Sequence, residues 1–268
     1  MAALSAAGGF ESRGALGRGD SPVDAARGVD LLVIATPDDA VRRVATMVTP
    51  IATTAVIHLS GSLGLDVLAS HPRRGSLHPL TPLPTAAIGR ERLLSGITFA
   101  VAGDPMARRL AESLGGTAVE VPDHDRATYH AAASIAANHL VALLGQVERV
   151  AATIGLPLDA FAGLLRAATD DALQLGPRRA LTGPAVRGDW ATLEHHRVVL
   201  SGMAGDRVEL AAYDAMVGLA RRLSMDPATT GPGFEEGSEP AEPVASTPGD
   251  VAAPGSPFVG AVDVEQVA

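Results

Sequence analysis

The sequence predicts an α/β fold in which a parallel sheet is followed by an all-helical second domain. Between residues 29 and 122, short apolar runs alternate with helical patterns, which is typical of parallel strands joined by crossover helices. From residue 123 to residue 226 the pattern is helical only, dense in alanine and leucine and divided by glycine and proline. We therefore expect two folded domains, residues 29–122 and 123–226.

The two ends of the chain differ from these domains in composition. Residues 1–28 are rich in Gly, Ala, Ser and Arg without periodicity, so we expect a flexible segment. Residues 227–268 contain seven acidic residues, no basic residue and many Pro and Gly residues, so we expect a disordered acidic tail.

The overall composition excludes several classes of function. A net charge of −9 argues against a nucleic-acid-binding or anionic-membrane surface. The absence of cysteine excludes disulfides and thiolate chemistry, and the absence of lysine excludes Schiff-base catalysis. The N-terminus lacks a signal-peptide pattern, and no apolar run approaches the roughly 18 residues of a membrane span. We expect a cytoplasmic protein.

Five short apolar runs predict buried strands, each covered on both faces. They are residues 31–35, 55–59, 75–78, 97–102 and 117–121. Helical patterns lie between some of them: one capped by Asp38 or Asp39, one near 65–70 and one over 104–114. In the second domain we expect one long helix from His124 to about Ile154. Shorter helices follow at about 158–175, 192–203 and 206–224.

Small and polar residues follow two of the predicted strands. Ser60 and Gly61 end the strand at 55–59, and His78 ends the next one. The carboxyl ends of neighbouring strands line one crevice in an open α/β sheet, and ligands bind there. We therefore expect Ser60, Gly61 and His78 to share one rim.

The long helix carries polar residues at intervals of four. His130, Ser134 and Asn138 are therefore expected on one face. They either hydrogen-bond to neighbouring helices or form a polar stripe that faces the crevice. In the loop 181–189, Asp189 can cap the next helix, and Arg187 either has a structural role or binds a carboxylate or phosphate.

Several catalytic and metal-binding motifs are absent. The eight histidines include no H-E-x-x-H pattern and have no cysteine partner, so we expect no metal site. The G-x-S-x-G motif of serine hydrolases is also missing. The glycines of residues 14–19 follow the wrong order and spacing for a dinucleotide-binding loop.

Five groups of residues together carry a family resemblance. They are Thr36-Pro37-Asp38-Asp39, His58-Leu59-Ser60-Gly61, Ser76-Leu77-His78-Pro79-Leu80, Tyr129-His130-Ala131-Ala132 with Ala137-Asn138-His139-Leu140, and Leu181-Thr182-Gly183-Pro184 with Arg187-Gly188-Asp189. With these groups the chain resembles an uncharacterised bacterial family of Rossmann-like proteins with a helical C-terminal domain of unknown function. These relatives are usually classed as NADP-dependent oxidoreductases. They are similar in architecture to pyrroline carboxylate reductase, ketopantoate reductase and the hydroxyacid dehydrogenases.

The resemblance implies NADP or NAD as cofactor, bound across the strand ends. Thr36, Pro37 and Asp38 would then lie beside the cofactor's ribose. Ser60 and Gly61 would lie near its nicotinamide.

The resemblance also implies roles on the substrate side. Asn138 corresponds to the asparagine of the K-x-x-x-N pattern of hydroxyacid dehydrogenases, but the lysine of that pattern is Ser134 here. His78, His130 or a water molecule would therefore supply the proton. Asn138 and Ser134 would orient the reacting oxygen, and Arg187 would hold an anionic group of a small-molecule substrate.

One departure from the family leaves two functions open. The family's opening strand and its G-x-G-x-x-G loop have no counterpart here, so we expect a truncated Rossmann-like domain. Either the gene begins upstream of its assigned start, or cofactor binding has been lost. The protein is then an oxidoreductase acting on a small carbonyl, imine or hydroxy acid, or a non-catalytic ligand-binding or dimerisation module. In both cases we expect a homodimer formed through the helical domain.

Overall fold

The computed structural model describes residues 9–203, 207–225 and 258–263. These residues form two compact units. One contains residues 9–139 and 258–263, and the other contains residues 140–203 and 207–225. The division falls inside the long helix, whereas the sequence analysis placed a domain boundary at 122/123.

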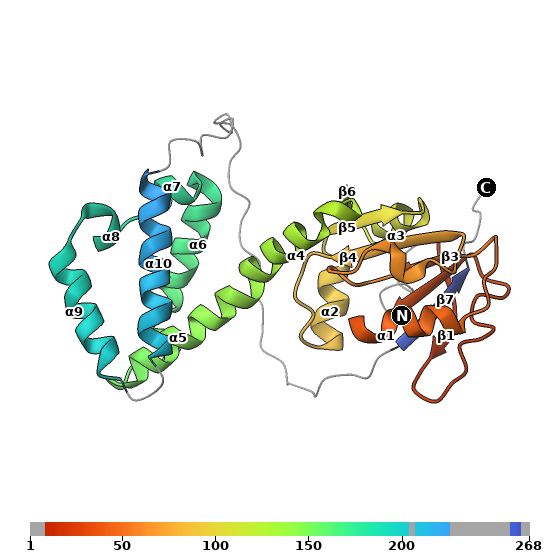
Figure 1. Ribbon diagram of the computed structural model, residues 1–268. Coiled ribbons are helices and arrows are strands. Elements are labelled where there is room, and N and C mark those ends of the chain that lie inside the picture. The colour runs from red at the N-terminus through yellow and green to blue at the C-terminus, as the bar shows by residue number, and fades with distance from the viewer. Residues whose placement is uncertain (1–8, 204–206, 226–257, 264–268) are drawn as a thin grey trace. The chain divides into compact units, whose positions relative to one another are not determined.

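The first unit is built on a seven-stranded sheet with strand order β1-β7-β2-β3-β4-β5-β6 (Figure 1). All five strands predicted from the sequence are present. The seven strands are β1 (Glu11–Leu16), β2 (Leu31–Ala35), β3 (Ala55–His58), β4 (Arg73–Pro79), β5 (Thr98–Gly103), β6 (Thr117–Glu120) and β7 (Phe258–Asp263).

The predicted parallel pairing is present from β2 to β4 but not between β4 and β5. Strands β2, β3 and β4 are parallel, but β5 runs antiparallel to β4, and β6 is parallel to β5. The Leu80 amide donates to the Thr98 carbonyl at 2.9 Å, so β5 begins beside the end of β4. The segment between them, which includes the unpredicted helix α2 (Ala86–Leu93), is therefore an excursion at one end of the sheet and not a crossover.

The prediction that both chain ends lack regular structure is wrong for two segments. Strand β1 pairs antiparallel with β7, and β7 pairs antiparallel with β2. Composition averaged over a long segment hides a short apolar run such as Phe258–Asp263, which can pair with a strand edge. The remaining parts of the expected flexible segment and disordered tail, residues 1–8, 226–257 and 264–268, lie outside the described residues.

The core of this unit has two layers, one on each face of the sheet. Leu31 and Val33 of β2 contribute to the layer that contains helix α3 (Met106–Ser113). The alternate residues Leu32 and Ile34 contribute to the layer that contains helix α1 (Asp38–Met47). Successive side chains of a strand point to opposite faces. Both faces are covered, which explains why β2 is apolar throughout.

The predicted long helix is present, with one interruption. It consists of α4 (Arg126–Ser134), a π-helical turn at Ile135–His139 and α5 (Leu140–Ala152). Together with α5, the helical unit contains α6 (Ala162–Leu175), α7 (Pro177–Ala180), α8 (Pro184–Arg187), α9 (Trp190–Ser201) and α10 (Val208–Met225). Asp189 caps α9 as predicted, since its carboxylate accepts from the Thr192 amide at 3.1 Å. None of the helices in the described ranges combines the length and the apolar character needed to span a membrane.

Candidate functional site

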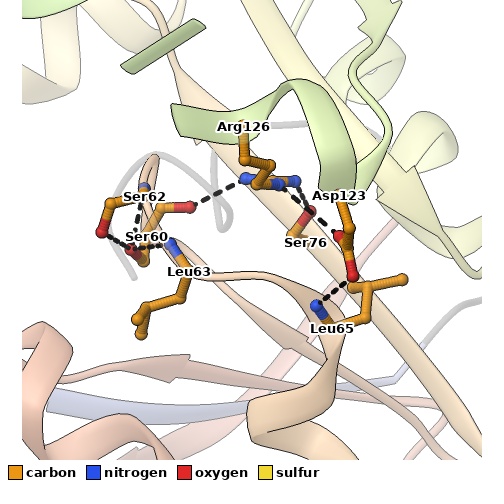
Figure 2. Close-up of polar contacts among 7 residues, drawn as sticks. All are labelled: Ser60, Ser62, Leu63, Leu65, Ser76, Asp123 and Arg126. Carbon is orange, nitrogen blue, oxygen red and sulfur yellow. Dashed lines mark hydrogen bonds and ion pairs between the residues drawn. The ribbon is translucent and has the colours of Figure 1, made fainter. Parts of the chain in front are cut away.

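The ends of β2 and β3 are joined by a carboxylate that binds two serines. Asp38 follows β2, and its Oδ2 accepts from the Ser60 and Ser62 hydroxyls, each at 2.7 Å. The Ser60 hydroxyl in turn accepts from the Ser62 and Leu63 amides at 3.1 Å (Figure 2). The prediction that Asp38 or Asp39 caps α1 is wrong, because Pro37 is the N-cap residue and no side chain caps this helix. Asp38 instead fixes the turn after β3.

A buried arginine attaches the first turn of α4 to the strand ends (Figure 2). Arg126 is 1% exposed. Its Nη1 donates to the Ser60 carbonyl at 3.1 Å, and its Nη2 donates to the Ser76 hydroxyl. Burial lowers the pKa of Arg126, and the negative charge of Asp123 opposes that shift. A buried cation is costly unless its donors are satisfied, so these contacts hold the helix against β3 and β4.

Asp123 connects this arginine to the loop after β3. Its Oδ1 lies 3.9 Å from Arg126 Nε, and its Oδ2 accepts from the Leu65 amide at 2.9 Å. The helix start, the strand ends and the loop therefore form one polar network.

Two histidines from different elements meet over Gly61. A side-chain Cβ at Gly61 would lie 2.9 Å from His78 Nε2 and 2.9 Å from His130 Cδ2. The rings of His78 and His130 are 6.2 Å apart and nearly perpendicular. His78 Nδ1 also lies 2.7 Å from the hydroxyl oxygen of Tyr129. Only glycine leaves room for both imidazoles beside the backbone at the tip of β3.

His78 is held in its neutral form. Burial lowers its pKa, and the nearby His130 and Arg126 act in the same direction, while Asp38 opposes them. His78 is therefore an uncharged imidazole at neutral pH. It can donate or accept one proton without first losing a charge.

His58, at the end of β3, is part of the core and not of the rim. It is fully buried, and neither ring nitrogen has a hydrogen bond of regular geometry among the described residues. Burial lowers its pKa to about 4, with a further contribution from Arg126. The Gly64 backbone and the carboxylates of Asp38 and Asp123 oppose this shift.

The other predicted residues have more varied positions. Thr36 follows β2, and its hydroxyl is buried without a hydrogen-bond partner among the described residues. Ser134 is half-buried, and Asn138 is exposed in the π-helical turn. A π-turn holds more residues than an α-turn, so the spacing of four does not repeat exactly there. Arg187 ends α8 in the second unit, and its role remains a prediction.

Sequence reasoning missed Tyr129 and Arg126 as members of this site. A signal for Arg126 was available. It lies in the first turn of a helix, where the helix dipole disfavours a cation, so a specific partner was to be expected. Within the described ranges, no three His, Asp or Glu side chains are grouped so that they could hold a metal ion.

The chain is similar to proteins of known structure and to one family model. Residues 95–219 match the model for a domain of unknown function, DUF2520. TM1727 from Thermotoga maritima is 26% identical, with a TM-score of 0.61 over 72% of this chain and 77% of that one. BF3122 from Bacteroides fragilis, a proposed NADP oxidoreductase, is 18% identical, with a TM-score of 0.61 over 74% and 79%.

A reductive aminase from Aspergillus terreus, solved with NADPH and ethyl-5-oxohexanoate, is 14% identical, with a TM-score of 0.54 over 76% and 77%. At identities below 25%, the likeness shows a shared fold. No protein with a curated description matches this sequence. The chain thus has a Rossmann-like fold, and its residues 95–219 match the model of the domain of unknown function DUF2520.

Proposed function

We propose that the protein is an NAD(P)-dependent oxidoreductase that transfers a hydride between a nicotinamide and a small carbonyl, imine or hydroxy-acid substrate. The observation that carries this proposal is the pair of imidazoles, His78 and His130, facing the bare backbone of Gly61. Hydride transfer to a carbonyl needs a proton donor beside the reacting oxygen. A glycine lets a flat ring approach the backbone closely. The fold shared with NADP-dependent reductases supports the same proposal.

The proposed cofactor, NADP or NAD, would contact the strand ends. Ser60 and Gly61 would lie beside the nicotinamide, and Thr36, Pro37 and Asp38 beside the ribose. The buried Thr36 hydroxyl has no hydrogen-bond partner in the described part of the chain, which suits a ribose contact. Asp38 already accepts from two serines, so its first role is to shape the turn. A glycine-rich phosphate loop is not among the described residues, so the proposed contacts are limited to the nicotinamide and ribose.

On the substrate side, His78 or His130 would exchange the proton with the reacting oxygen. Ser134 and Asn138, farther along the same helix, would orient that oxygen.

The helical unit supports a second proposal, that two copies of the chain pair through it. None of the fourteen residues of α6 is buried. Leu164 and Leu173 on this helix are 68% and 80% exposed. Exposed apolar side chains on a helix mark an interaction surface. If the chain is a non-catalytic relative, this dimerisation is its main activity.

Calorimetric titration with NADPH and with NADH tests the oxidoreductase proposal. The wild-type chain should bind at least one of them. Gly61→Leu should abolish binding, because its side chain would collide with His78 and His130 and displace both imidazoles. Gly163→Leu is the matched control, since Gly163 lies on α6 with no other atom near its Cβ position. A wild-type chain that binds neither cofactor contradicts the proposal and favours the non-catalytic alternative.

A further inference from the structure

Both tyrosines of the chain are paired with histidines in the same geometry. In each pair the hydroxyl oxygen lies 2.7 Å from Nδ1, the ring centroids are 5.7 Å apart and the rings are nearly perpendicular. The pair Tyr213–His196 is in the helical unit. The pair Tyr129–His78 is at the strand ends, where His78 lies against Gly61. One pair is therefore placed for chemistry, and the other provides a natural control.

We propose that Tyr129 and His78 form a proton relay that delivers a proton from the tyrosine hydroxyl to the oxygen of a carbonyl substrate above Gly61. This inference rests on the proposed oxidoreductase function and assigns its acid. Tyr129 is part of a motif quoted above, but the sequence assigns it no role.

The direction of the hydrogen bond follows from the chemistry of its two atoms. A neutral imidazole has one nitrogen that donates and one that accepts, and a phenol both donates and accepts. An imidazole lone pair is a better acceptor than a phenolic oxygen. Tyr129 therefore donates to Nδ1, and the ring proton of His78 is on Nε2. That nitrogen is the one that lies 2.9 Å from the Cβ position of Gly61.

The relay step balances in atoms and electrons. A bound reduced nicotinamide would supply the hydride that forms a C–H bond to the carbonyl carbon, and the C=O π electrons would move to oxygen. That oxygen takes the Nε2 proton of His78, while Nδ1 takes the hydroxyl proton of Tyr129. His78 ends neutral with its proton on Nδ1, and Tyr129 ends as a phenolate that water reprotonates. The carbonyl would be reduced to an alcohol, and the nicotinamide that supplies the hydride would be the reductant.

The charges around the pair agree with this sequence of events. Burial raises the pKa of Tyr129, which keeps the resting phenol protonated, and the positive charge of Arg126 acts to lower it. Arg126 would therefore stabilise the transient phenolate. The same positive charge disfavours a cationic iminium substrate. An iminium also accepts a hydride without needing a proton, so the relay selects for ketones, aldehydes and 2-oxo acids.

The tautomer of His78 can be measured by nitrogen NMR of the histidine rings without any cofactor. We expect the Nε2–H tautomer in the wild-type chain and a shifted Nδ1 resonance in Tyr129→Phe. The matched variant Tyr213→Phe should shift His196 and leave His78 unchanged. The relay is overturned if wild-type His78 is protonated on Nδ1, or if its Nδ1 resonance does not change in Tyr129→Phe. Either result holds even if the protein binds NADPH.

Turnover of NADPH with a panel of small ketones, 2-oxo acids and cyclic imines is the second readout. Tyr129→Phe should lower kcat for the carbonyl probes by about 100-fold, within the range for loss of acid catalysis, with little change in KM. The imine probes should change by less than about twofold, and Tyr213→Phe should be unchanged throughout. Equal losses for both probe classes overturn the relay. If the wild-type chain turns over none of the probes, the proposed function is overturned. The tautomer of His78, measured by NMR, still tests whether Tyr129 donates to His78.

Discussion

Lowering the pH should destabilise the sheet unit because His58 must become charged inside its core. The pKa of His58 falls from 6.5 to about 4 on folding, mainly through burial. Between these values the unfolded chain binds a proton that the folded unit does not. The free energy of unfolding is therefore unaffected above pH 6.5 and falls as the pH drops toward 4. At about 1.4 kcal/mol per pKa unit, the loss is about 3 kcal/mol over the whole window.

Other groups near the site act in the same window. The pKa of His78 is also lowered, so it adds to the loss. The charges of Arg126 and Asp38 act on both rings, and the charge of Asp123 acts on His58. A variant is needed to isolate His58. His58→Leu keeps an apolar side chain in the core and removes the titrating group, whereas His195→Gln replaces an exposed histidine on α9.

Hydrogen–deuterium exchange in increasing urea, measured on peptides that cover β3 and β4, gives the free energy of unfolding of this unit. We expect the wild type and His195→Gln to lose stability between pH 7.5 and pH 4.5. His58→Leu should lose about 2 to 3 kcal/mol less over the same interval. Equal losses in the wild type and in His58→Leu would refute the assignment of the buried, neutral histidine.

Three further changes test the sheet and the candidate site. Gly103→Ala should destabilise the sheet unit by at least about 2 kcal/mol in urea denaturation, because its Cβ would lie 2.4 Å from the Arg74 carbonyl at a φ of +80°; an unchanged midpoint would contradict this. Arg73→Met should cost about 1 to 2 kcal/mol, measured in the same way, since it removes two hydrogen bonds of 2.9 and 3.0 Å to Asp104. Asp38→Ala should weaken NADPH binding about tenfold in calorimetry by releasing the turn after β3, an effect of about 1.4 kcal/mol; unchanged affinity would remove Asp38 from the site.

The part of the fold that the sequence predicts is the part determined by local pattern. Apolar runs such as Leu31–Ala35 are confirmed as strands because their side chains are buried on both faces. The direction of β5 and the pairing of β7 with β2 were not predictable in this way. Both depend on contacts between segments that are distant in sequence, and no local pattern encodes them.

The candidate site was also predictable only where a local pattern determines it. The end of each strand could be read from the residues that interrupt an apolar run, and the structure brings Gly61, His78 and His130 together. The partners of these residues could not be read in this way. Tyr129 reaches His78 across 51 positions of the chain, and Arg126 reaches Ser60 across 66. Hydrogen bonds of this kind exist only once the helix has docked on the sheet.

The most direct test of the whole account is to follow the ring signals of the histidines by NMR while NADPH is added to the wild-type chain. Saturable shifts of His78 and His130, with His195 and His196 unchanged, are the predicted result. A cofactor that binds yet moves only histidines of the helical unit, or moves none, would place the nicotinamide away from Gly61 and contradict the proposed site.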